Sequence, residues 1–290
     1  MIEAFQANEI DVGIGLTEAW LAGYLKHAAA QPQQNSERQI NLPYHITSPY
    51  TLSQLRWALS TGPHRDDINN AEDLKGKKVG ISRFGSGSHI MACVLAHNNG
   101  WVDEASFKFI EVGPFASLRE AVNSGDADFF MWEHFTTKKY FDDGTLKRLG
   151  ETVTPWPGWH IATRGPSSDE RVTEKLLPDL RKGIHYFGAH KDESVDLICS
   201  IMEYSRADAE QWYEEVKFPY QSLYLNETVI RKALKTLVDA GFPGGENEKW
   251  LRAFSLRAKD VLYENKHFHK VFYSGKSKSE SPLEGVGASK

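Results

Sequence analysis

The sequence has few cysteines, no long apolar run and no excess of basic residues. Its 290 residues include only two cysteines, Cys93 and Cys199, and no Cys-x-x-Cys pair, which excludes a thiolate zinc site and a dithiol redox motif. No stretch approaches the roughly 18 apolar residues of a membrane-spanning helix, and the first residues do not resemble a signal peptide. We therefore expect a soluble, cytoplasmic protein that has no membrane partner.

The charge balance limits the possible partners further. The chain has 34 basic and 39 acidic residues, which gives a net charge of −5 with histidine neutral. A mildly acidic chain of this kind argues against an extended phosphate-binding surface, and so against nucleic acid as the main partner.

A strand-then-helix alternation occupies residues 77–151. Candidate strands lie at 78–82, 107–112, 127–132 and 146–151, with helices near 87–99, 115–124 and 134–140. This order predicts an α/β fold with mainly parallel sheets. The flanking regions predict strands near 9–15, 39–47, 52–60 and 159–164, a helix over 17–30, and helices near 169–190, 192–202, 206–216 and 227–240.

The most informative segment is a Gly/Ser loop between a predicted strand and a predicted helix. Such a loop directs backbone N–H groups and hydroxyls at one point, next to the positive end of the helix. Its small residues allow a ligand to approach the backbone closely. The segment therefore predicts a site for a small anion or polar group, and its simpler interpretation is a tight turn with a serine cap. The candidate ligand-binding residues in it are Ser82, Arg83, Gly85, Ser86, Gly87 and Ser88.

Four further side chains are candidates for ligand contacts. Trp132 and Glu133 end a predicted strand. Trp132 could stack on a flat ligand, and Glu133 could accept a hydrogen bond from a ligand N–H group. Glu133 equally suits the start of the next helix. Trp156 lies in a stiff Pro/Gly turn, where packing in the core is its alternative role. Thr17 offers a hydroxyl at another strand end.

Familiar catalytic and metal-binding motifs are missing. The loop lacks the Lys-Ser/Thr of a P-loop and the third glycine of a dinucleotide fingerprint. No His-Glu-x-x-His, no Gly-x-Ser-x-Gly and no carboxylate or histidine set at metal spacing occurs. We therefore expect no catalytic residue, no metal site and no cofactor.

Three segments together resemble a known family. They are the run from Ile2 to Gly15 with its Glu-Ile-Asp-Val, the phrase Asp73-Leu-Lys-Gly-Lys-Lys-Val-Gly80, and the run from Phe115 to Asp128. Their order and spacing are similar to type 2 periplasmic-binding-protein-like chains, in the group of nitrate, taurine and sulfonate substrate-binding proteins and thiamine-pyrimidine synthases. Details of the Gly/Ser loop and of 132–135 look most like the eukaryotic, largely fungal branch.

The resemblance implies two α/β lobes with a ligand between them, joined by crossing segments near 57–61 and 160–164. It implies lobe 1 at 1–60 and 162–243, lobe 2 at 61–161, and a C-terminal extension at 244–290 whose end is disordered. Family members carry a further strand, loop and helix ahead of the position where this sequence starts, so lobe 1 is expected to be incomplete at its N-terminus. An uncovered sheet edge of that kind favours self-association.

The function expected from these observations is non-catalytic binding of a small sulfonate-like or pyrimidine-like molecule between the lobes. Two alternatives remain: an enzyme related to thiamine-pyrimidine biosynthesis, and a truncated variant that binds nothing. The synthases of this group use a cysteine-rich iron motif, a lysine that holds pyridoxal phosphate and an active-site histidine. The two distant cysteines cannot form the iron motif, which argues against close functional equivalence.

Overall fold

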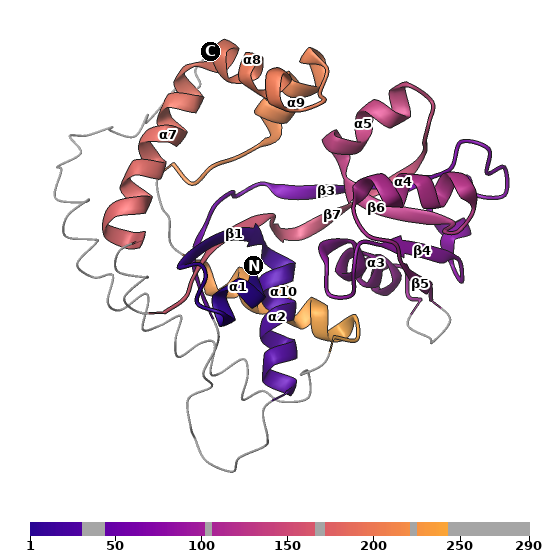
Figure 1. The fold of residues 1–290 in the computed structure, drawn as a ribbon, viewed down its shortest axis with the longest axis horizontal. Coiled ribbons are helices and arrows are strands. Elements are labelled where there is room, and N and C mark those ends of the chain that lie inside the picture. The colour runs from indigo at the N-terminus through magenta and orange to yellow at the C-terminus, as the bar shows by residue number, and fades with distance from the viewer. Residues whose placement is uncertain (31–43, 102–105, 166–171, 221–224, 243–290) are drawn as a thin grey trace, which may run out of the picture.

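Two separate β-sheets form the framework of the protein, and helices pack around both (Figure 1). The computed structural model describes residues 1–30, 44–101, 106–165, 172–220 and 225–242. The strands in these residues are β1 (Val12–Leu16), β2 (His45–Pro49), β3 (Gln54–Thr61), β4 (Lys78–Ile81), β5 (Lys108–Glu111), β6 (Phe129–Glu133), β7 (Lys147–Pro157) and β8 (Trp159–Thr163). The helices are α1 (Ile2–Gln6), α2 (Thr17–Ala29), η1 (Ala71–Leu74), α3 (Gly87–Asn98), α4 (Phe115–Ser124), α5 (His134–Asp142), the π-helical turn η2 (Val172–Leu176), α7 (Leu177–Ala189), α8 (Lys191–Ile201), α9 (Arg206–Glu215) and α10 (Glu227–Asp239).

The smaller sheet joins segments that are far apart in the sequence. Its strand order is β1-β8-β2, and both pairs are antiparallel, with Val12 and His45 each opposite Thr163. Aromatic side chains from α2 and from the residue before β2 pack together, and the rings of Tyr24 and Tyr44 are stacked 4.6 Å apart. The predicted strand at 159–164 is thus confirmed as the centre of this sheet.

The larger sheet contains the predicted strand–helix alternation. Its order is β5-β4-β6-β3-β7, with β4 parallel to both β5 and β6, as crossover helices require. Its helices α3, α4 and α5 follow β4, β5 and β6 in turn. The two-lobe α/β architecture expected from the sequence is therefore present.

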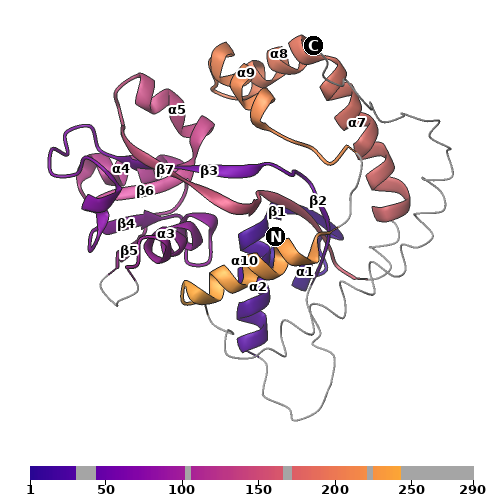
Figure 2. The same ribbon diagram turned by 180° about the vertical axis from the view of Figure 1, so that it is seen from behind.

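Two expectations about the strands need correction. The sheets are not mainly parallel: the larger one is mixed, because β3 pairs antiparallel with both β6 and β7, and the described strands of the smaller one are all antiparallel. The second crossing between the sheets is β7, and β8 is the central strand of the smaller sheet rather than a crossing segment. Since β3 carries the chain into the larger lobe and β7 carries it out, the two run in opposite directions side by side (Figures 1 and 2).

One buried core connects the two lobes. It includes Trp20 from α2, Ile90 from α3 and Phe129 from β6, and the apolar face of α10 completes it. On α10 the buried side chains recur at helical spacing, at Ile230, Ala233, Leu234 and Leu237. Because α10 contacts both α2 and α3, it links the lobes to each other (Figure 2).

The helices α7, α8 and α9 form a separate group (Figure 1), held together by a small cluster of Val195, Ile198 and Ala209. These helices and α10 confirm the helical region predicted beyond residue 169. Within the described residues, no helix combines the length and apolar composition needed to cross a membrane. The expected strand residues 39–43 and the extension at 244–290 lie outside the described residues.

Candidate binding site at the junction of the two sheets

The Gly/Ser loop is an ordered turn held by its own serines. The Ser86 side chain caps α3 by accepting from the backbone N–H of His89, and its hydroxyl lies 2.9 Å from that of Ser88. The Ser88 hydroxyl in turn accepts from the backbone N–H of Ser82 at 3.0 Å. The serine-cap interpretation is therefore correct, and the hydroxyls already have partners within the protein.

The outer part of the loop faces solvent. Arg83 is exposed, and Gly85 adopts a φ of +78°, the left-handed conformation that glycine accepts without strain. Phe84, between them, is 60% exposed. Arg83 and Gly85 therefore lie on the side of the loop away from the buried serines.

Gly87 is the point at which the two lobes meet. A β-carbon added there would lie 2.7 Å from Leu16 Cδ1 and 2.8 Å from Trp57 Cη2. Leu16 ends β1 of the smaller sheet, whereas Trp57 lies on β3 of the larger sheet. A β-carbon would force these side chains to shift, so glycine permits the close approach of the Gly/Ser loop to the strand end that precedes Thr17.

Thr17 uses its hydroxyl to hold the start of α2. The hydroxyl donates to the carbonyl of Pro157 and lies 2.7 Å from Nδ1 of His160. Because the threonine proton goes to Pro157, Nδ1 of His160 must carry a proton and donate it to the threonine oxygen. Burial lowers the pKa of His160 to about 4, so at neutral pH the ring is neutral and has its single proton on Nδ1.

Glu18 is the functional candidate that the sequence analysis did not single out. Its side chain is fully buried; Oε2 accepts a hydrogen bond of 2.9 Å from Trp156 Nε1, while Oε1 has no partner within the described part of the chain. Burial raises the pKa of Glu18 to about 7. The only sequence signal for it was an acidic residue at a strand end, which is equally typical of a solvated first helical turn.

Neither predicted tryptophan presents a free ring face at the junction. Trp156 is 1% exposed and belongs to the shared core, so the core alternative is correct. Trp132 stacks on Phe115 with ring centroids 5.2 Å apart. It pairs with Ala58 on β3, and successive strand residues point to opposite faces, so Trp132 lies on the other face from Trp57. Trp57 is the aromatic residue at the junction.

Glu133 caps helix α5. Its carboxylate accepts hydrogen bonds from the backbone N–H groups of Phe135 at 3.0 Å and Thr136 at 2.7 Å, and from the Thr136 hydroxyl. Burial raises its pKa, and the bonds from the start of α5 oppose that rise. Both oxygens therefore have protein donors, which is the helix-start role left open by the sequence.

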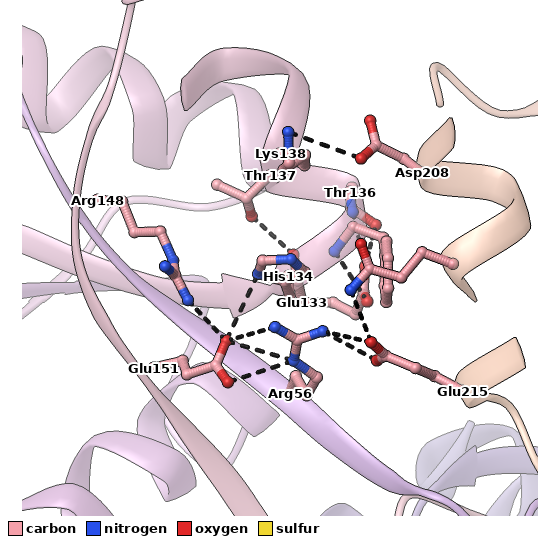
Figure 3. A network of polar contacts seen from close by, with 12 residues as sticks. Arg56, Glu133, His134, Thr136, Thr137, Lys138, Arg148, Glu151, Asp208 and Glu215 are labelled. Atoms are coloured by element: carbon pink, nitrogen blue, oxygen red, sulfur yellow. Dashed lines mark hydrogen bonds and ion pairs between the residues drawn. The ribbon is translucent and has the colours of Figure 1, made fainter. Parts of the chain in front are cut away.

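A network of charges surrounds this cap (Figure 3). The Arg56 guanidinium is 2.9 Å from Glu151 of β7 and 2.9 Å from Glu215 of α9, so it joins the larger sheet to the helical group. His134, buried beside it, has its pKa lowered by burial and by the positive charge of Arg56. Because Arg56 precedes Trp57 on β3, it points to the other face of the strand, away from the junction.

The comparisons with known proteins agree with this architecture. A family model described as Ca3427-like PBP matches residues 57–152. The solved CA3427 gene product of Candida albicans, described as defining a family with the generic periplasmic binding protein fold, is 34% identical, with 88% of this chain and 80% of that chain covered at a TM-score of 0.73. A search of curated proteins found no significant match.

More distant solved structures share only the fold. The alkanesulfonate-binding protein SsuA from Xanthomonas axonopodis pv. citri, bound to MOPS, is 15% identical over 89% of this chain and 82% of its own, at a TM-score of 0.63. The aliphatic sulphonate-binding SsuA of Escherichia coli is 16% identical over 100% of this chain and 82% of its own, at a TM-score of 0.57.

The fold and the junction define a protein of the periplasmic-binding-protein class, which confirms the resemblance read from the sequence. At the level of family, the chain belongs to the one that the Candida albicans CA3427 protein defines.

Proposed function

We propose that this protein binds a small polar or anionic molecule at the junction of its two lobes, without catalysing a reaction on it. The observation that carries the proposal is the meeting of the two lobes at Gly87, where the starts of α2 and α3 converge. Backbone N–H groups in the first turn of each helix have no acceptor within the helix. Such groups favour a polar or negatively charged ligand.

Solved proteins of the same fold support a binding function. SsuA proteins of the same fold are described as sulfonate-binding, and one of them holds MOPS. In this chain, Gly87 contacts Leu16 and Trp57 so closely that a ligand can enter only if the lobes move apart there. Ligand binding would then be coupled to opening and closing of the lobes.

The test is a thermal-shift screen of the purified chain, followed by calorimetric titration of each compound that raises the midpoint. A ligand that binds only the native state raises stability by about 2.7 kcal/mol at a hundredfold excess over its dissociation constant. We expect Gly87→Val, which fills the junction, to abolish the shift. Gly183→Ala is the matched control, because a β-carbon there meets nothing within 4 Å.

Two results would contradict the proposal. One is a cooperative melt that no compound of the panel shifts, and the other is a Gly87→Val variant that binds as tightly as the parent chain.

A finer proposal concerns self-association. Among the described strands β1 lies at one edge of the smaller sheet, and its Ile14 is 39% exposed. We propose that this edge pairs with a second copy, which light scattering across a concentration series tests. A strictly monomeric mass at every concentration would overturn it. The cytoplasmic location stays a prediction of the sequence.

A further inference from the structure

Two buried polar atoms near the junction have no hydrogen-bond partner among the residues that the structure describes. Glu18, on the smaller lobe, is 0% exposed, and its Oε1 is unpaired. Trp57, on the larger lobe, is 4% exposed, and its Nε1 is also unpaired. Buried polar groups are nearly always paired, so an orphan acceptor and an orphan donor on facing lobes indicate a missing partner.

Contacts around the junction bring the surroundings of the two side chains together. Trp57 lies on β3, and Trp156, whose Nε1 donates to Glu18 Oε2, lies on β7, the strand paired with β3. Both tryptophans belong to the core that the lobes share. The ring of Trp57 approaches Gly87, which also approaches Leu16, two residues before Glu18. Glu18 and Trp57 therefore both border the place where α2, α3 and the crossing strands converge.

We propose that the ligand is a small amide- or amidine-type molecule that donates an N–H to Glu18 Oε1 and accepts a hydrogen bond from Trp57 Nε1. This inference rests on the proposed function and narrows the chemical class of the ligand. An indole N–H can only donate, so it requires an acceptor on the ligand. The ionised Glu18 carboxylate can only accept, so its complement is an N–H group, and a bond from that group favours the ionised form over the protonated one.

A sulfonate fits this pair poorly. Its oxygens are all acceptors and carry a negative charge, which would lie beside a buried carboxyl group whose described side-chain partner is the neutral indole of Trp156. Arg56, next to Trp57 in the sequence, binds Glu151 and Glu215 on the other face of β3. Arg83 is exposed on the outer side of the Gly/Ser loop.

The experiment titrates two sets of probes into the full chain and monitors the melting midpoint and binding heat. One set contains acetamide, acetamidine, nicotinamide and cytosine; the other contains methanesulfonate, taurine and MOPS. We expect binding from the first set and none, or at least tenfold weaker binding, from the second.

Two variants test the contacts. Glu18→Gln keeps the size of the side chain but gives it an N–H, so it should weaken the N–H probes at least tenfold and improve sulfonate binding. Trp57→Phe removes the donor together with the part of the ring that reaches Gly87, and it should weaken the same probes at least tenfold. Ser200→Ala, an exposed change on α8, is the control and should leave binding unaltered.

The outcomes separate this inference from the proposed function. Tighter binding of sulfonates than of the N–H probes, or affinities unchanged by Glu18→Gln, would overturn the inference and leave the binding function intact. A cooperative melt that no probe of either set shifts would overturn both.

Discussion

At the scale of single residues, Glu18 and His160 titrate in opposite senses at the start of α2. Burial raises the pKa of Glu18 to about 7, so the folded state keeps a proton that the unfolded chain loses near pH 4.5. The stability from this group therefore falls as the pH rises from 4.5 to about 7. Burial lowers the pKa of His160 to about 4, so the unfolded chain holds the extra proton up to about pH 6.5, and stability rises with pH in that window. The two effects oppose each other from about pH 4.5 to 6.5.

The first prediction follows from this opposition. Each of these pKa changes corresponds to about 3 kcal/mol of unfolding free energy, so the native chain should show little net change from the two groups between pH 4.5 and 6.5. Glu18→Gln removes the Glu18 titration and leaves that of His160. The unfolding free energy of this variant should therefore rise by about 3 kcal/mol as the pH increases from 4.5 to 6.5. Urea denaturation at several pH values measures it.

Glu120→Gln, at an exposed glutamate on α4, is the control and should keep the profile of the native chain. A Glu18→Gln variant whose stability follows the native pH profile would show that Glu18 titrates normally.

At the same scale, the sequence predicted the serine cap before α3, because a serine at a strand-to-helix turn can accept from a backbone N–H of the first helical turn. The ligand contacts predicted for the loop stay a prediction. It could not distinguish Trp156 as a core residue from Trp156 as a ligand contact. The hydrogen bond to Glu18 that settles the point joins residues 138 positions apart, and no local pattern encodes it.

At the scale of secondary-structure elements, α3 depends on its cap. Ser86→Ala removes the acceptor for the His89 N–H. It also removes the buried partner of the Ser88 hydroxyl. We expect a loss of about 1 to 2 kcal/mol in unfolding free energy, the range measured for N-cap serines. Thermal or urea unfolding tests this, with Ser200→Ala as the exposed comparison. A loss no greater than that of Ser200→Ala would contradict the capping role.

The helix α10 gives a second prediction at this scale. Leu237 is 0% exposed in the core that α10 shares with α2 and α3. Leu237→Ala should lower the unfolding free energy by about 2 to 5 kcal/mol, because it leaves a cavity between the lobes. Leu197→Ala, at a 59% exposed position, should change it by about 0.5 kcal/mol or less. Equal effects of the two changes would show that α10 does not pack as described.

The sequence was most informative about the positions of helices and strands. The periodic helices after residue 169 and the strands from 78 to 151 occur where the alternation of apolar and polar residues predicted them. The direction of β3 was missed, because periodicity identifies a strand but does not fix which neighbour it pairs with.

At the scale of the whole molecule, the lobes share one core rather than two. Apolar residues of α2, α3, α10 and the larger sheet are in continuous contact. We therefore expect a single cooperative unfolding transition, with equal calorimetric and van't Hoff enthalpies. Differential scanning calorimetry measures both. Two resolved transitions would show that the lobes unfold independently.

The sequence by itself determined the α/β class, the strand–helix order, the serine-capped turn before α3 and the family, since each depends on residues close together in the chain. The tertiary structure alone decided that Gly87 lies at a contact between the lobes, that Trp57 rather than Trp132 or Trp156 faces it, and that Glu18 is buried with one oxygen unpaired among the described residues. The physical reason is that burial and hydrogen-bond partners are set by segments that are far apart in the chain. Thr17 and His160 meet only because β8 pairs with β1, and the candidate site lies beside that pairing.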